Sequence, residues 1–102
     1  MKVIKEMSGL IDEEIDDAEK YAHLAMVYKE EMPDIAELFF SLSLEEIKHM
    51  NMLHNAVVQV INKHKDDDDP RTEGMKLAHE FIHEQEIKKE NKVRVLQAMF
   101  RE

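Results

Sequence analysis

Residues that interrupt helices are almost absent from this sequence, and their scarcity limits the available folds more than any other feature. The 102 residues include only two Gly and two Pro. Most of the other residues are charged (36%) or apolar (43%), and the chain is rich in the good helix formers Glu, Lys, Leu, Met and Ala. The sequence therefore predicts an all-α protein whose chain can turn at few positions.

The two prolines indicate where those turns lie. Proline fits the first turn of a helix and disfavours helix at the residue before it. Pro33 should therefore begin one helix and Pro70 another. The acidic run Asp66–Asp69 suits the positive end of the helix at Pro70, with Asp69 as its N-cap. Three helices are expected, over residues 2–31, 33–64 and 70–101.

Each of these helices would be about 45 Å long at about 1.5 Å per residue. Short links make neighbouring helices antiparallel. A chain of this length is too short for two domains. The expected architecture is therefore an antiparallel helical hairpin plus a third long helix, within a single domain spanning residues 1–102.

Apolar residues recur in steps of three and four along the first two segments, which is the spacing of a helix face that packs on a core. The first stripe contains Met7, Ile11, Glu14, Ala18, Tyr21 and Ala25. The second stripe contains Ile35, Phe39, Leu42, Glu46, His49, Leu53, Ala56 and Val60. The third segment is less regular, because a largely polar stretch interrupts its apolar positions Met75, Ala78, Ile82, Val93, Leu96 and Phe100.

Ionisable residues interrupt both regular stripes near their middle. Glu14 lies in the first stripe, and Glu46 and His49 occupy consecutive positions in the second. Burying one such group alone costs several kcal/mol, so each must be paired, protonated or bound to a cation. Glu14 and His49 both lie about 24 Å from the turn, at about 1.5 Å per residue, and Glu46 lies one helical turn nearer. The three side chains can therefore meet in one layer.

Glu46 and His49 form a Glu-x-x-His pair, whose i, i+3 spacing directs both side chains from the same helix face. In helical-bundle proteins with two carboxylate-bridged irons, each half of the site takes one Glu from one helix and a Glu-x-x-His pair from the next. Carboxylate oxygens and imidazole nitrogens suit iron or manganese. The simpler alternative is a buried ion pair or a polar seam that binds no metal.

These residues resemble those of the ferritin-like superfamily, in its rubrerythrin and encapsulated-ferritin branch, over roughly residues 10–60. In that family a ligand Glu is followed seven residues later by Tyr, as Glu14 is followed by Tyr21 here. The resemblance implies that Glu14 is a terminal ligand, Glu46 the bridging ligand and His49 the terminal imidazole. Tyr21 is then either a redox-active or ligand-bonding phenol near the site, or an aromatic residue at the edge of the core.

A complete ferritin-like bundle has four helices and two such half-sites, whereas this chain has one clear half-site and a third helix. Encapsulated ferritins complete the site by pairing two subunits across a twofold axis, so the resemblance implies a homodimer or a higher homo-oligomer. Two copies of Glu14, Glu46 and His49 would then supply six ligands. Alternatively, the third helix supplies ligands within the same chain, from Glu80, His83 and Glu86. These three residues can equally form a polar face toward solvent or toward another subunit.

The implied function is that of a non-haem di-iron, or di-manganese, protein that oxidises Fe(II) with oxygen or peroxide, for iron handling or oxidant removal. Two alternatives remain. One is a helical scaffold whose polar core layer fixes the pairing of its helices. The other is metal storage or sensing without turnover. The remaining histidines are interpreted as surface residues: His23, His54, His64 and His79.

Charge and composition exclude several other classes. Lys and Arg number 14 against 23 Asp and Glu, which gives a net charge of −9 with His neutral. Binding to nucleic acid or to an anionic membrane surface is therefore not expected. The absence of Cys excludes disulfides, iron–sulfur clusters and thiolate zinc sites. No apolar run approaches the roughly 18 residues of a membrane span, and the first residues do not resemble a signal peptide, so we expect a cytoplasmic protein.

Overall fold

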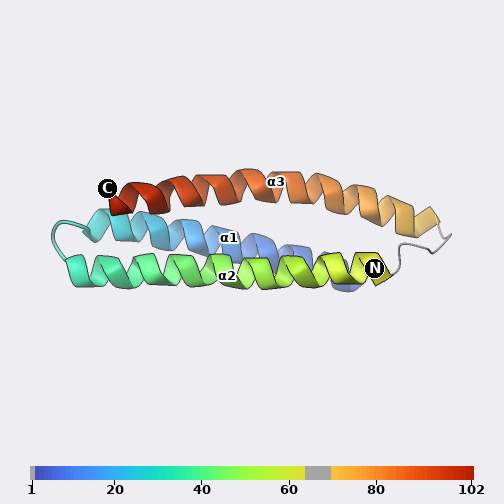
Figure 1. Ribbon diagram of the computed structural model, residues 1–102, viewed down its shortest axis with the longest axis horizontal. Helices are drawn as coiled ribbons and strands as arrows, with labels where there is room; N and C mark the ends of the chain where they lie inside the picture. The colour runs from blue at the N-terminus through green and yellow to red at the C-terminus, as the bar shows by residue number, and fades with distance from the viewer. Residues whose placement is uncertain (1, 64–69) are drawn as a thin grey trace.

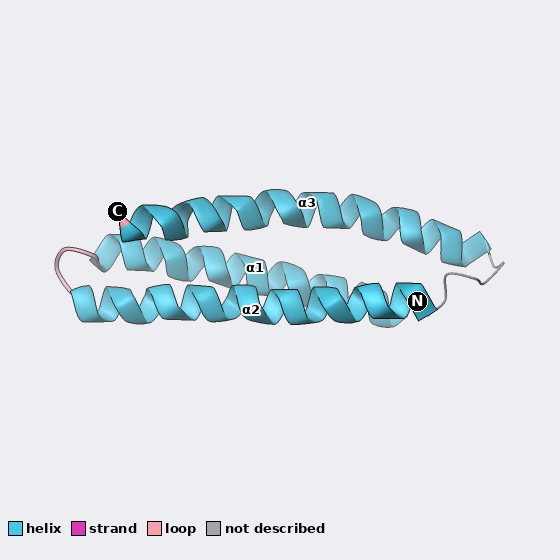
Figure 2. Cartoon of the chain, viewed as in Figure 1, coloured by secondary structure: helices cyan, strands magenta, loops and turns pink. Residues whose placement is uncertain are grey.

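The computed structural model describes residues 2–63 and 70–102, except for six side chains at the start of the last helix, and all the regular structure described is helical (Figures 1 and 2). The helices are α1 (Lys2–Tyr28), α2 (Pro33–Lys63) and α3 (Pro70–Arg101). The all-α prediction is therefore confirmed. Some of the features predicted from the sequence lie outside this description, namely the Asp66–Asp69 run with its Asp69 N-cap, His64, and the side chains of Met75 and Ala78.

The turn between α1 and α2 follows from Pro33. α1 ends at Tyr28, three residues earlier than predicted, and the chain reverses between this residue and Pro33. The Met32 amide donates to the Tyr28 carbonyl at 2.9 Å, and the Ala36 amide donates to the Met32 carbonyl at 2.9 Å. Pro33 opens α2, where its missing N–H costs no hydrogen bond. The chain thus reverses within a few residues, as the hairpin requires.

α1 and α2 form an antiparallel hairpin, and α3 lies along it (Figure 1). α3 runs antiparallel to α2, so the C-terminus lies at the end of the molecule that carries the α1–α2 turn. The molecule is a rod measuring 58 × 17 × 16 Å. α3 packs more extensively on α1 than on α2. The hairpin is therefore the main structural unit, and α3 covers one of its faces.

The core follows the line where the three helices meet. Its main cluster consists of Ile4, Ile11, Ile15, Ala18, Ile47, Met50, Val57 and Val93. A second cluster consists of Ala25, Ala36, Phe40 and Phe100. Buried alanines in the second half of α1 keep that part of its core face small, which allows close packing. None of the helices in the described part of the chain is apolar over a length that could cross a lipid bilayer.

The predicted core face of α1 is confirmed at Ile11, Ala18 and Ala25. Met7, Glu14 and Tyr21 of the same stripe are only half-buried. The predicted core face of α2 is wrong by one residue. The core-facing side chains of α2 are Ala36, Phe40, Ser43, Ile47, Met50 and Val57. The predicted stripe, with Glu46 and His49, lies beside this face and is half-buried or exposed. The reason is α3, whose Val93 and Phe100 pack on the flank of α2 that carries Ile47 and Phe40. The predicted stripe therefore borders the core on the open side of the hairpin.

Ion pairs explain how the polar middle of α3 still packs on α1. The Lys89 ammonium lies 3.3 Å from Asp12 Oδ1 and 3.4 Å from Asp16 Oδ1. The Lys92 ammonium lies 3.0 Å from Glu19 Oε1. The lysines of α3 thus form ion pairs with the acidic side chains of α1. Apolar side chains are needed for packing only at the positions of α3 that face the core.

Ser43 joins all three helices inside the core. Its hydroxyl donates to the Ala18 carbonyl of α1 at 2.7 Å and accepts from the Gln97 side-chain amide of α3 at 2.9 Å. Ser43 and Gln97 are both buried. Because each buried polar group has a partner, this bridge fixes the lateral position of the helices without an unpaired group.

Candidate metal centre

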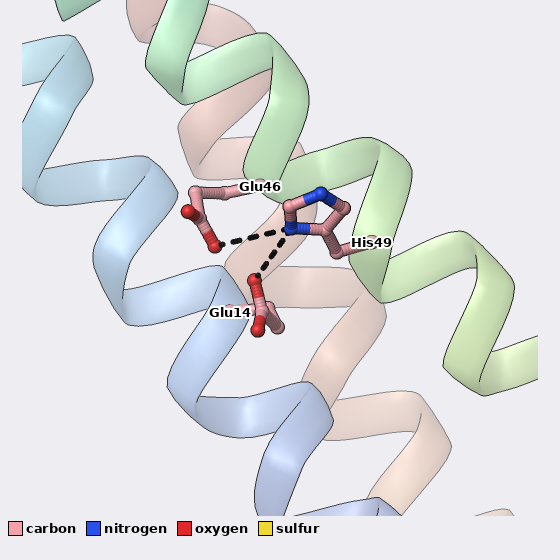
Figure 3. A group of neighbouring side chains, drawn as sticks. All are labelled: Glu14, Glu46 and His49. Atoms are coloured by element: carbon pink, nitrogen blue, oxygen red, sulfur yellow. Dashed lines mark ion pairs between the residues drawn. The ribbon is translucent and has the colours of Figure 1, made fainter.

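Glu14, Glu46 and His49 converge at the middle of the hairpin (Figure 3). His49 Nδ1 lies 3.4 Å from Glu14 Oε2 and 3.8 Å from Glu46 Oε2. One potential ligand atom from each residue lies within 4.8 Å of the other two. The single layer expected from the sequence therefore exists, because the antiparallel hairpin brings the middle of α1 level with the middle of α2.

The two carboxylates are close enough to raise the pKa of Glu46 to about 7. A side-chain hydrogen bond with Glu14 contributes most, followed by burial and by repulsion between the two negative charges, while the charge of His49 acts in the opposite direction. Glu46 therefore carries a proton for part of the time near neutral pH. A carboxyl whose pKa is raised by a neighbouring carboxylate and by burial is a feature of many functional sites.

One oxygen of this group has no hydrogen-bond partner among the described residues. Glu14 Oε2 is buried and unpartnered, since its approach to His49 Nδ1 is an ion-pair contact without hydrogen-bond geometry. A buried oxygen without a partner costs free energy, which a bound cation would recover. The donor set of two carboxylates and one imidazole fits iron or manganese. Three ligands from one chain fit half of a two-metal carboxylate site.

The group opens away from α3. In Figure 3 the three side chains lie in front of α1 and α2, while α3 passes behind the hairpin. The His49 side chain is 51% exposed, against 25% for Glu14 and 18% for Glu46. A shallow groove adjoins the group and is lined by Leu10, Glu14, His49, Met52, Leu53 and Ala56. The site therefore faces the open side of the hairpin, beside an apolar groove.

The other residues predicted for the site lie elsewhere. Tyr21 lies seven residues from Glu14, about 10 Å along α1 at about 1.5 Å per residue, and its ring stacks on Phe39 at 6.3 Å. The structure thus places Tyr21 in an aromatic contact at the edge of the core, one of the two positions that the sequence allowed.

No residue of α3 joins the group of potential ligands in the described part of the chain. Glu80 is exposed, His83 stacks on His54, and Glu86 is only 4% exposed within the packed interior. This arrangement brings together the three ligands of the hairpin but does not bring Glu80, His83 or Glu86 to them.

The prediction that His54 and His79 are surface residues is wrong. The rings of His54 and His79 are half-buried and stack with His83 between α2 and α3. The i, i+4 spacing of His79 and His83 was a visible signal for this, because residues four apart share a helix face. His23 is exposed beside Glu19, as expected.

Comparison with known proteins agrees with this geometry. A sequence model of the rubrerythrin family matches residues 10–96. Neither the curated proteins nor the solved structures include a significant match to this chain. The family match covers most of the chain, including the residues of the candidate metal centre, and confirms the resemblance found in the sequence. The chain therefore belongs to the rubrerythrin family, whose ferritin-like helical domains bind iron.

Proposed function

We propose that this protein is a non-haem di-iron carboxylate protein that oxidises Fe(II) with dioxygen or peroxide. The observation that carries the proposal is the convergence of Glu14, Glu46 and His49 from two helices of a rubrerythrin-family chain. Two Fe(II) ions give up two electrons, which with two protons reduce dioxygen to hydrogen peroxide or hydrogen peroxide to water. Glu14, Glu46 and His49 would hold the iron, and manganese is the alternative cation for the same ligands.

The charges of the ligands suit a pair of divalent ions. Each chain supplies two carboxylates at the site, Glu14 and Glu46, so two chains would supply four negative charges to balance the four positive charges of two Fe(II) ions. Glu46 would release its proton on binding, because a ligating carboxylate must be ionised. His49 would bind through a neutral nitrogen, so binding should weaken at acid pH.

A second copy of the chain is the proposed source of the remaining ligands. Three ligands are too few for a two-metal site, and the site faces the open side of the hairpin, where another hairpin can approach. Leu10 and Met52 lie in the groove beside the ligands, yet they are 46% and 66% exposed. Large apolar side chains exposed together around an incomplete polar site favour a symmetric interface at this face.

The activity is tested by adding Fe(II) aerobically to metal-free protein and following the ferric absorbance. Glu46→Ala should abolish metal-dependent oxidation above the rate in buffer. Glu45→Ala is the matched control, because Glu45 is the exposed neighbour that pairs with Lys48 rather than with the site. The control should oxidise iron at the original rate. Oxidation by Glu46→Ala at the original rate would show that the site lies elsewhere.

The same experiment separates the alternative functions. A metal store or sensor without turnover would bind Fe(II) but would not accelerate its oxidation. A scaffold whose polar layer only fixes the pairing would bind no iron, and Glu46→Leu would leave it equally or more stable, because a costly buried carboxylate would be removed.

The dimer is tested by light scattering across a range of concentrations. Leu10→Asp should convert the dimer into a monomer, because it places a charge at the centre of the proposed interface. Val95→Asp is the matched control, since Val95 is an exposed apolar residue of α3 and α3 lies on the other side of the hairpin. A monomer for the unchanged chain at micromolar concentration would contradict the two-chain site.

A further inference from the structure

Three histidine rings lie together between α2 and α3, apart from the candidate iron site. His54 belongs to α2, and His79 and His83 lie one turn apart on α3. The ring centroids are 4.4 Å apart for His54 and His83, 5.8 Å for His79 and His83, and 6.3 Å for His54 and His79. The rings are nearly parallel, with interplanar angles of 15°, 9° and 22° for the same three pairs.

These centroid separations match those of three imidazoles on one metal ion. With a zinc–nitrogen distance of about 2.0–2.1 Å and tetrahedral angles, the centroids of ligating imidazoles lie about 5 Å apart. The observed separations of 4.4–6.3 Å bracket this value. Two histidines four residues apart on one helix also have the spacing used in helical zinc sites.

Metal binding at this site would need rotation of the rings and small shifts of their centres. The nitrogens of the three rings do not converge in the stacked arrangement. The bond from Cβ to Cγ points almost at the centre of an imidazole ring, so rotation about it turns the nitrogens while the centroid stays nearly in place. This torsion is broad and has low barriers, so α2 and α3 can remain where they are while the nitrogens turn.

The stacked arrangement leaves a polar atom unsatisfied. His83 Nδ1 is buried and has no hydrogen-bond partner among the described residues. A buried nitrogen without a partner costs free energy, and coordination to a cation would recover that cost. His83 therefore carries a nitrogen that a bound cation could satisfy.

The pKa values of two of these rings are lowered, which favours the neutral form that binds metal. Burial lowers the pKa of His54, as does the charge of His83, while Glu90 acts in the opposite direction. Burial also lowers the pKa of His79, with further contributions from His83 and His54 and an opposing one from Glu80. Neutral imidazole is the form that binds metal, so these two rings need to lose little or no proton near neutral pH.

We propose that His54, His79 and His83 form a second metal site, which binds a borderline divalent transition-metal ion such as Zn²⁺ and ties α3 to α2. A set of imidazoles without carboxylates favours zinc or copper over iron, in contrast to the carboxylate-rich site on the other face of the hairpin. The site would strengthen the weaker of the two contacts made by α3, since α3 packs mainly on α1. This site does not depend on the iron chemistry.

The test measures Zn²⁺ binding by calorimetry to the full-length Glu46→Ala protein, in which the carboxylate site is disabled. About one Zn²⁺ per chain should bind. Replacing each histidine separately with Phe keeps an aromatic ring in the stack but removes the ligand, and should weaken binding at least about tenfold. The three variants are His54→Phe, His79→Phe and His83→Phe. His23→Ala is the control for an exposed histidine beside a carboxylate and should bind as before.

Thermal unfolding provides a second measurement on the same proteins. Zn²⁺ should raise the Tm of Glu46→Ala, and the increase should be lost in the Phe variants. X-ray absorption at the zinc edge of Glu46→Ala should show three imidazole ligands, and this holds even if a Phe variant fails to fold. Absence of Zn²⁺ binding, unchanged binding in the three Phe variants, or a zinc spectrum with oxygen ligands alone would each overturn the proposal.

Discussion

Glu86 is a buried acid whose effect on the free energy of unfolding should depend on pH. Glu86 is 4% exposed, and its Oε1 has no hydrogen-bond partner among the described residues. Burial raises the pKa of Glu86 to about 7, with a smaller contribution from Asp12 that is opposed by Lys89. In the unfolded chain the pKa should return to about 4.5, the ordinary value for Glu.

The sign of the effect on stability follows from this difference. Below about pH 4.5 the carboxyl is protonated in both states and favours neither. Between about pH 4.5 and about pH 7 the unfolded chain ionises first, so the free energy of unfolding falls as pH rises. A pKa raised by about 2.5, at about 1.4 kcal/mol for each pH unit, gives an upper limit of about 3–4 kcal/mol, reached above pH 7. Water that reaches the group would reduce this value.

Glu86→Gln removes the titration while keeping the shape of the side chain. The free energy of unfolding is measured with urea for both proteins at about pH 4, 6 and 8, at one protein concentration because the chain is proposed to associate. The variant should gain stability relative to the original protein by up to about 3–4 kcal/mol between the lowest and highest pH. The new amide can also change the stability by an amount that does not depend on pH. Such a change does not affect how the stability difference between the two proteins varies with pH.

Glu84→Gln provides the matched control. Glu84 is an exposed residue of the same helix, two positions away, so its substitution makes the same chemical change outside the core. If the difference between Glu86→Gln and the original protein is the same at about pH 4 and about pH 8, Glu86 is not buried as an uncompensated acid. The packing of α3 on α1 described above would then be wrong at this position.

Two further substitutions test the core. Ser43→Ala should cost about 1–3 kcal/mol of unfolding free energy, because it leaves the buried amide of Gln97 without its acceptor, and Ser43→Thr separates the loss of the hydroxyl from a change of volume. If Ser43→Ala leaves the urea midpoint unchanged, the bridge between the three helices is refuted. Ile15→Ala should cost about 2–5 kcal/mol, because Ile15 is fully buried, whereas Ile35→Ala at a partly exposed position should cost far less. Equal losses in urea unfolding would refute the assigned core face.

The helices could be predicted from local chemistry, because proline and side-chain periodicity act within a few residues. Pro33 placed the start of α2 correctly, and Pro70 that of α3. The end of α1 was less accurate, because the helix stops at Tyr28 to let the chain reverse before Pro33. Such a reversal depends on how two helices pack, which the local sequence does not specify.

The layer of ligands could be predicted because it depends only on distance from the turn. Glu14 and His49 lie at equal distances along an antiparallel pair, so any close hairpin brings them level. The face that α2 buries could not be predicted in the same way. It depends on the side of the hairpin that α3 covers, and the stripes with Ile35 and with Ala36 differ by a single residue.

The histidine cluster escaped prediction for a related reason. His79 and His83 lie on one face of α3, but their approach to His54 depends on the pairing of α3 with α2. Glu86 likewise looked like a surface or ligand residue, because a buried acid paired with no base is rare and its burial depends on the packing of α3. The features that could not be predicted from the sequence therefore depend on contacts between helices that are distant in sequence.

The proposed function requires that two chains hold a pair of irons between their copies of Glu14, Glu46 and His49. Its most direct test is anomalous scattering at the iron edge from crystals of the iron-loaded protein. We expect about one iron per chain, with a pair of irons between two hairpins and ligands from both. Iron bound elsewhere, or a pair of irons held by the side chains of one chain alone, would contradict it.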